Sequence, residues 1–185
     1  MKKALLLLLT LTIAAVSFAA DNKPIEAVFN KYWEAYARKD FVKAAAEILP
    51  SDLDEAKSEL LPIFLGAQTH KKKEAQDVVA LFFGRAVGKA RESLSPAEVY
   101  AGLNRVVTAN NPDFFELLKE AKTSIVFIRT PDDDNAEVHF QVTIRAESDM
   151  DSENLTKKNG RWWLRINEDP KQVAAQLKAM FAQGI

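Results

Sequence analysis

The chain has 185 residues, 48% of them hydrophobic and 28% charged, which is the composition of a folded domain rather than of a disordered chain. Its 25 Lys and Arg residues against 26 Asp and Glu residues give a net charge of −1, and it has no cysteine. The missing cysteine excludes a disulfide framework, a thiolate metal site and a lipidated cysteine, and the balanced charge argues against a nucleic-acid partner.

The beginning of the chain has the pattern of a bacterial signal peptide. Two lysines precede the apolar run 4–16, and Ser17 and Ala19 place small residues where a signal peptidase cleaves. No later apolar run reaches the roughly 20 residues needed to span a bilayer. We therefore expect residues 1–19 to be removed. Residues 20–185 should then be periplasmic or secreted, without a lipid anchor and without stable membrane insertion.

Helical periodicity dominates the first part of the remaining chain. A helix is predicted from Pro24, because apolar and aromatic residues recur at three- and four-residue steps up to Tyr36. Asp40 is predicted to cap a short second helix. A capping-box-like start at Ser51 predicts a third helix, which Pro62 should kink or end early.

The longest helix is predicted over 73–90, where apolar residues keep the helical period without a gap. Gly84 and Gly88 lower its helical propensity, which predicts a close backbone contact there. Two further helices are predicted to begin after Ser95 and Asn111, since each of these capping residues precedes a proline.

The periodicity then changes from 3.6 residues to two. Strands are predicted at 124–129 and 136–146, and the second alternates apolar and polar side chains so that one face is buried. Residues 148–154 show no such alternation and are predicted to form a loop. Asn159 and Gly160 form the preferred two-residue turn of a hairpin.

The hairpin should place Leu155 opposite Leu164, and Asp169 should cap a final helix. The order of elements is then helices, an antiparallel meander of about four strands, and one helix. This order is typical of an α+β fold. We expect a single α+β domain over 20–185, with a helix-rich segment at 51–121.

Two segments share a pattern with one superfamily. They are the aromatic helix with the acidic residue that follows it (Phe29, Tyr32, Trp33, Tyr36, Asp40) and the last hairpin (Asn159, Gly160, Arg161, Trp162, Trp163). In these segments the chain resembles the nuclear-transport-factor-2-like (NTF2-like) superfamily, in particular its small exported bacterial members. The resemblance implies a strongly curved sheet wrapped around helices into a cone with an apolar interior.

His139 is the candidate for acid–base chemistry because it lies on the polar face of the strand predicted at 136–146. The resemblance implies a pairing of His139 with Asp40, as in cyclase-like and isomerase-like members. In an enzyme of this kind, either Asp40 or Tyr32 would orient His139. The alternative is an exposed strand histidine without a catalytic role. We favour that alternative, because a histidine without a located partner is poor grounds for assigning a base.

No cofactor or metal site is predicted. Asp132, Asp133 and Asp134 lack the ligand spacing of a calcium loop and are predicted to form a turn. The sequence contains no glycine-rich phosphate loop, no nucleophile elbow and no His-Glu-x-x-His pair. His70 begins a short basic run, which is too small to form an anion-binding surface without other basic groups.

Aromatic residues are the remaining functional signal, although most are expected in the core. Trp162 and Trp163 occupy adjacent strand positions and cannot both face inward. Our leading hypothesis is an exported, non-catalytic domain that binds an apolar or amphipathic small molecule, or a partner protein. The residues predicted to line its site are Tyr32, Trp33, Tyr36, Phe83, Trp162 and Trp163. A small enzyme using His139 and a periplasmic lipid carrier are the alternatives.

Overall fold

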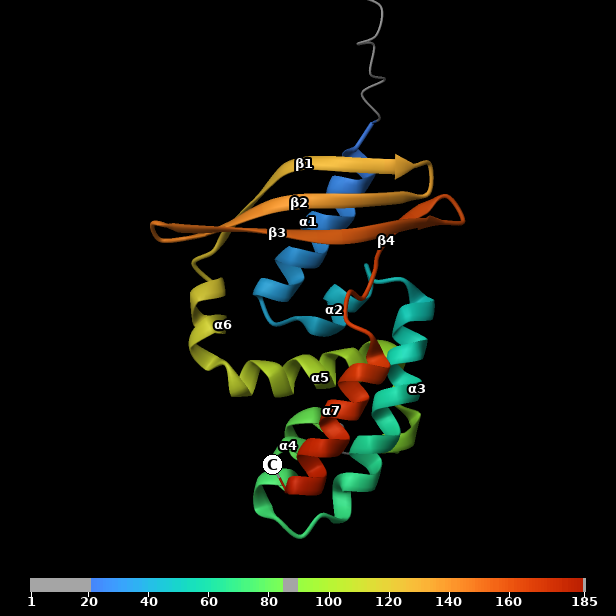
Figure 1. Cartoon of the computed structure of the whole chain (residues 1–185), viewed down its shortest axis with the longest axis vertical. Helices are drawn as coiled ribbons and strands as arrows, with labels where there is room; N and C mark the ends of the chain where they lie inside the picture. The colour runs from blue at the N-terminus through green and yellow to red at the C-terminus, as the bar shows by residue number, and fades with distance from the viewer. Residues whose placement is uncertain (1–20, 85–89, 185) are drawn as a thin grey trace, which may run out of the picture.

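The computed structural model describes residues 21–84 and 90–184, and its fold is α+β, as predicted. Helices come first, a curved antiparallel sheet of four strands follows, and one helix ends the chain (Figure 1). The predicted signal peptide and Gly88 lie outside the described residues. Within those residues, no helix combines the length and the apolar character that crossing a membrane requires.

The sheet and the helical bundle occupy opposite ends of the molecule. The helices are α1 (Lys23–Ala37), α2 (Phe41–Ala45), α3 (Pro50–Gly66), α4 (Lys73–Phe83), α5 (Pro96–Asn110), α6 (Pro112–Leu118) and α7 (Pro170–Gln183), with 3-10 helices η1 (Ala67–Thr69) and η2 (Arg91–Ser93). The strands are β1 (Lys122–Asp132), β2 (Asn135–Ile144), β3 (Glu147–Lys158) and β4 (Arg161–Leu164), paired in the order β1-β2-β3-β4. In Figure 1 the sheet and α1 form one end, α3, α4 and α7 form the other, and α5 crosses between them.

Several helix starts confirm the capping predictions. Ser95 and Glu98 form a complete capping box at the start of α5. Asp40 accepts a hydrogen bond from the backbone N–H of Lys43 at the start of α2. Asp169 accepts one from the backbone N–H of Lys171 at the start of α7. These local signals fix where the three helices begin.

The start and the interior of α3 differ from the prediction. The helix begins at Pro50, with Leu49 as its N-cap, and not at a capping box on Ser51. Proline suits the first helical position because the N–H that it lacks would have no partner within the helix. The helix also continues through Pro62 to Gly66. Buried apolar residues around Pro62 pack into the bundle, and this packing offsets the lost helical hydrogen bond.

The helix predicted over 73–90 is also shorter than expected. It ends at Phe83, because Gly84 adopts a positive φ of 54°, which glycine tolerates and which breaks the helical ladder. Arg105 of α5 then donates to the carbonyls at this end, including that of Leu81 at 3.0 Å. The side chain thereby satisfies acceptors that the helix leaves open.

A close helix contact lies at Gly102, a glycine that the sequence predictions did not single out, while a Cβ atom on Gly84 would stand 3.0 Å from Arg105 Nε. A Cβ atom on Gly102 of α5 would stand 2.7 Å from the carbonyl oxygen of Phe82 and 2.9 Å from its ring. Glycine therefore allows α5 to approach α4 at this point.

Strand β3 corrects the prediction that residues 148–154 form a loop. It pairs with β2 along its length, from Thr156 opposite Asn135 to Glu147 opposite Ile144. The β3 positions on the face of the buried β2 residues are Glu147, Asp149, Asp151, Glu153 and Leu155. Carboxylates thus occupy most positions where apolar residues would have marked the strand, so the period-two signal is absent from the sequence.

The hairpin of β3 and β4 confirms its prediction. Leu155 pairs with Leu164, and Asn159 and Gly160 adopt positive φ angles of 53° and 76° in the turn.

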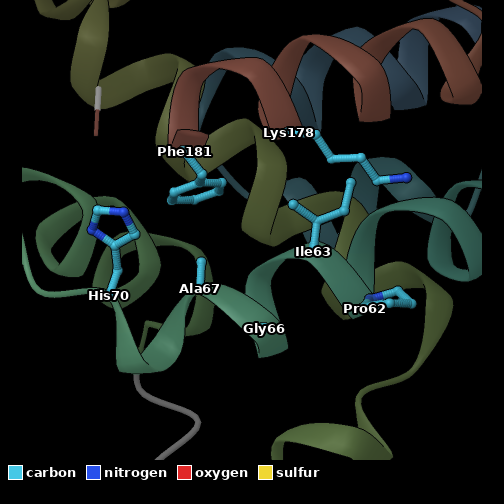
Figure 2. A pocket seen from close by; sticks show the side chains of 7 residues that line it. All are labelled: Pro62, Ile63, Gly66, Ala67, His70, Lys178 and Phe181. Atoms are coloured by element: carbon cyan, nitrogen blue, oxygen red, sulfur yellow. The ribbon is translucent and has the colours of Figure 1, made fainter. Parts of the chain in front are cut away.

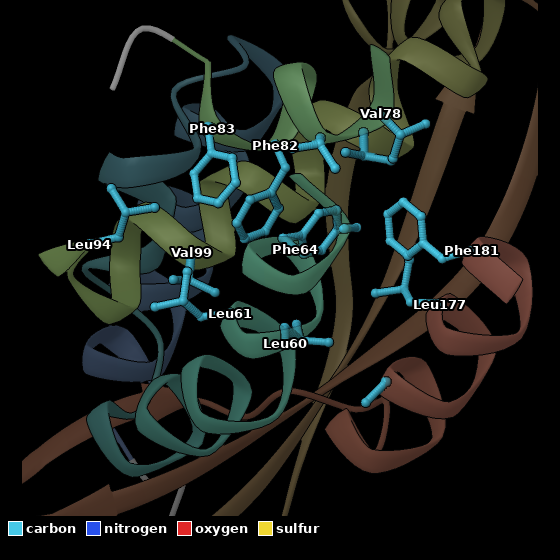
Figure 3. Packing of buried hydrophobic residues seen from close by; sticks show 14 of the residues in the cluster. Leu60, Leu61, Phe64, Val78, Phe82, Phe83, Leu94, Val99, Leu177 and Phe181 are labelled. Carbon is cyan, nitrogen blue, oxygen red and sulfur yellow. The ribbon is translucent and has the colours of Figure 1, made fainter. Parts of the chain in front are cut away.

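Two large apolar clusters form the core. Figure 3 shows the cluster of the bundle, in which the rings of Phe64 and Phe82 stack with centroids 3.6 Å apart. The second cluster joins α1 to the sheet, with Phe29 and Phe140 at 4.9 Å. Ile166, between β4 and α7, packs against both clusters. The segment after β4 therefore links the two halves of the core.

Strand β4 is held to the α2–α3 connection by main-chain hydrogen bonds. The N–H of Leu164 donates to the carbonyl of Glu47 at 2.9 Å, and the N–H of Leu49 donates to the carbonyl of Leu164 at 2.8 Å. Ile48 and Leu164 thus form an isolated parallel bridge. Because this bridge joins segments more than 100 residues apart, it positions the sheet relative to the bundle.

Replacing Gly102 with alanine should destabilise the protein by about 1–3 kcal/mol, since the new methyl group would meet Phe82 in a packed core. Gly66→Ala is the matched control, because nothing lies within 4 Å of a Cβ there. That change should leave stability unchanged or raise it by up to about 1 kcal/mol. Urea unfolding of both variants measures the difference, and equal effects would contradict the proposed contact.

Replacing Asp52 with alanine should cost about 1–3 kcal/mol, because its carboxylate accepts from Arg165 Nε at 2.6 Å and from the N–H of Ile166 at 3.2 Å. Asp54→Ala, on the exposed side of the same helix, should change stability by no more than about 0.5 kcal/mol. Denaturant unfolding measures the free energy of unfolding of the two variants. If Asp52→Ala loses no more stability than Asp54→Ala, the hydrogen bonds of Asp52 do not hold the segment after β4.

Candidate functional site

A cavity of about 670 Å³ lies between the inner face of the sheet and the helices. Helices α1 and α5, strand β3 and the segment from β4 to α7 contribute most of its lining. Sites for small molecules commonly have volumes of about 300–1,000 Å³ and combine apolar walls with a few polar groups. The cavity has the size and the composition of such a site.

Three aromatic residues of α1 form one wall of the cavity. The rings of Tyr32 and Tyr36, one helical turn apart, stack with centroids 5.6 Å apart and an interplanar angle of 28°. Trp33 lies edge-on to both, at 5.9 Å and 5.7 Å. The structure therefore brings together three of the six residues that the sequence predicts for a ligand site.

The tyrosine hydroxyls are neutral hydrogen-bonding groups. The hydroxyls of Tyr32 and Tyr100 lie 2.9 Å apart and form a hydrogen bond between α1 and α5. Burial raises the pKa of both residues well above the usual value. Burial, together with Glu168 and Glu153, also raises the pKa of Tyr36 to about 12. All three hydroxyls therefore keep their protons at neutral pH and can donate to or accept from a ligand.

Carboxylates line the side of the cavity formed by β3 and the β4–α7 segment. Asp151, Glu153 and Glu168 all belong to the lining. Burial, and then repulsion from Asp151 and Glu168, raises the pKa of Glu153 to about 7. The side-chain amide of Asn167 donates a hydrogen bond to Glu153 Oε2 at 3.1 Å, and this bond lowers the pKa and offsets part of the rise. Glu153 is therefore poised to change its charge near neutral pH.

Arg165 is the one basic residue among the described residues that line the cavity. Its guanidinium is 2.6 Å from Oδ2 of Asp52, a carboxylate that does not line the cavity. The positive charge is thus already paired, and the wall carries an excess of negative charge.

Sequence reasoning missed Glu153 and Tyr100. Glu153 lies in the segment 148–154, for which the sequence predicts a loop, so the sequence does not indicate that its side chain faces inward. Tyr100 lies on the inward side of the helix that begins after Ser95, three residues before Leu103. That helical spacing was present in the sequence and could have identified Tyr100.

The other three predicted ligand residues pack elsewhere. Phe83 is buried in the bundle, with the guanidinium of Arg91 4.7 Å above its ring. Trp162 packs against the cluster between α1 and the sheet. Trp163, on the opposite face, is covered by the guanidinium of Arg161 at 3.9 Å. The two tryptophans lie on opposite faces of the sheet, as predicted from their adjacent positions in the strand.

The structure does not bring His139, Asp40 and Tyr32 together. His139 lies on the sheet face opposite to the one that packs against α1, where its ring stacks on Phe127 at 4.1 Å. Its Nε2 atom is 3.2 Å from Glu137. Asp40 caps α2, and Tyr32 lies in the cavity on the other side of the sheet.

A smaller pocket of about 350 Å³ lies between the end of α3 and α7 (Figure 2). Ile63 and Phe181 supply apolar surface, and His70 and Lys178 supply its polar groups. Across the described parts of the chain, no group of His, Cys, Asp and Glu side chains is arranged to hold a metal ion.

No protein-family model, curated protein or solved structure matches the chain.

Replacing Glu153 with glutamine should flatten the dependence of stability on pH. The pKa of Glu153 is raised to about 7 in the folded state, against about 4.3 in an unfolded chain. The folded state then holds this proton more tightly, so stability falls as the pH rises through about 7. The wild type should lose about 1–3 kcal/mol between pH 5 and pH 8 from this residue.

Urea unfolding at the two pH values measures this loss. Glu147→Gln, at an exposed position of the same strand, should keep the wild-type dependence. An unchanged dependence in Glu153→Gln would show that Glu153 is not the titrating group.

Proposed function

We propose that the chain is an exported, non-catalytic domain that binds one amphipathic small molecule in the large cavity. The observation that carries this proposal is the combination, in about 670 Å³, of an aromatic wall with hydroxyl and carboxyl groups. Leu60, Leu103 and Val173 add aliphatic surface to the lining. A ligand with an apolar body and a polar head matches this division of the walls.

The arrangement of the titratable groups argues against catalysis by His139. The tyrosines stay protonated at neutral pH, and His139 faces away from the cavity. The alternative of an enzyme that uses His139 with Asp40 would need these side chains to meet, but His139 stacks on Phe127 on the outer face of the sheet and Asp40 caps α2.

Export and superfamily membership are part of the same proposal. The signal-like segment 1–19 supports a periplasmic or secreted location. The aromatic helix α1 against the inner face of a four-stranded meander supports membership of the NTF2-like superfamily. In that setting, the cavity would correspond to the interior of the cone.

Filling the cavity should prevent ligand binding. We expect N-phenyl-1-naphthylamine, a neutral apolar dye, to fluoresce on binding the wild type. Leu103→Trp should weaken this binding at least about tenfold, which corresponds to about 1.4 kcal/mol. Val42→Trp, on the exposed side of α2, should bind the dye like the wild type.

Val107→Trp provides a second test if Leu103→Trp folds poorly, because Val107 also lines the cavity but is 41% exposed. Circular dichroism establishes that each variant is folded. Dye binding that is unchanged in a folded cavity variant would overturn the proposal.

Native mass spectrometry of the protein, purified from the cells that express it without refolding, identifies the kind of ligand. A bound mass that organic solvent releases from the wild type, and that is absent from the folded cavity variant, supports the proposal. Phospholipid in the extract would favour the lipid-carrier alternative.

A further inference from the structure

We infer that the ligand carries a cationic head, an amine or a quaternary ammonium group, attached to an apolar body. This inference rests on the proposed function and specifies the chemical class of ligand for the same cavity. It follows from the charges of the lining residues and from the position of the aromatic wall.

The charge of the cavity wall is the first argument. Asp151, Glu153 and Glu168 belong to the lining, and the basic residue beside them, Arg165, is paired with Asp52 at 2.6 Å. An anionic head would add a further negative charge near these carboxylates in a partly desolvated space, which is unfavourable. A cationic head would reduce their mutual repulsion.

The aromatic wall is the second argument. Tyr32, Trp33 and Tyr36 line the same cavity that contains the carboxylates. Cations are attracted to aromatic rings, and quaternary ammonium groups are commonly recognised by clusters of aromatic residues. Aliphatic side chains from α3, α5 and α7 supply the apolar surface against which the body of the ligand can pack. An aromatic wall and an acidic wall in one cavity therefore select the same kind of head group.

The environment of Glu153 gives the third argument. Its carboxylate accepts one hydrogen bond, from Asn167 at 3.1 Å, while Asp151 and Glu168 repel it. Tyr32, Tyr36 and Tyr100 face it from α1 and α5 as neutral hydroxyls. A bound cation would supply the opposite charge. Cation binding should therefore favour the ionised form of Glu153 and release a proton near neutral pH.

Displacement of N-phenyl-1-naphthylamine by three octyl compounds tests the inference at pH 7.5. We expect octyltrimethylammonium to displace the dye at a concentration at least about tenfold lower than octanesulfonate does, a difference of about 1.4 kcal/mol. Octanol, which has no charge, should fall between them. Equal potency of the cation and the anion, or greater potency of the anion, would overturn the inference.

Variants connect the preference to the carboxylates. The double variant Glu153→Gln with Glu168→Gln should lose most of the preference for the cation and keep its affinity for octanol. Glu147→Gln, exposed on the same strand, should keep the wild-type preference. A preference that survives in the folded double variant would show that other groups recognise the head, against the inference.

The dependence on pH provides a further readout. Between pH 6 and pH 8 the affinity for octyltrimethylammonium should rise several-fold, because Glu153 ionises in this range. The affinity for octanol should stay constant, and Glu153→Gln should remove the rise. A constant affinity for the cation in the wild type would contradict the role of Glu153.

The dye experiments distinguish a failure of the proposed cavity function from a failure of the cationic-head inference. If the dye binds in the cavity but the three octyl compounds show no preference by charge, the proposed function stands and the cationic head is wrong. If the dye does not bind to the wild type and no bound molecule is found by native mass spectrometry, both are wrong.

Discussion

The parallel bridge between Ile48 and Leu164 is the contact on which the remaining geometry depends. On one side of it, the sheet and α1 share one apolar cluster, and on the other side α3, α4, α5 and α7 share another. Both partners in the bridge use main-chain groups, so the contact has a defined direction and register. Asp52 continues the contact by accepting hydrogen bonds from the two residues that follow β4.

The cavity follows from this arrangement. Helix α1 covers part of the inner face of the sheet, and the bundle is held at the far side of the bridge, so the space between α1, β3 and α5 is left open. The hydrogen bond between Tyr32 and Tyr100 crosses this space and connects the two halves at a second point. A space that is lined by both apolar and polar side chains and left unfilled by them can admit a ligand.

Burial gives the cavity its electrostatic character. Glu153 is flanked by other carboxylates and has a pKa of about 7, which is a cost to the folded protein at neutral pH. Under the proposed function, this carboxyl group takes part in recognising the ligand.

The sequence by itself determined the α+β class, the capped starts of α2, α5 and α7, the hairpin turn and the inward face of α1, because each is encoded within a few neighbouring residues. It did not determine that 148–154 forms a strand, since the inward positions there carry carboxylates and not the apolar residues that mark a buried face. Nor could it separate Phe83 from the cavity residues, because aromatic side chains suit a core and a ligand site equally well. Only the tertiary structure placed Tyr32, Tyr100 and Glu153 around one space, because that proximity arises from the packing of three segments that lie far apart in the chain.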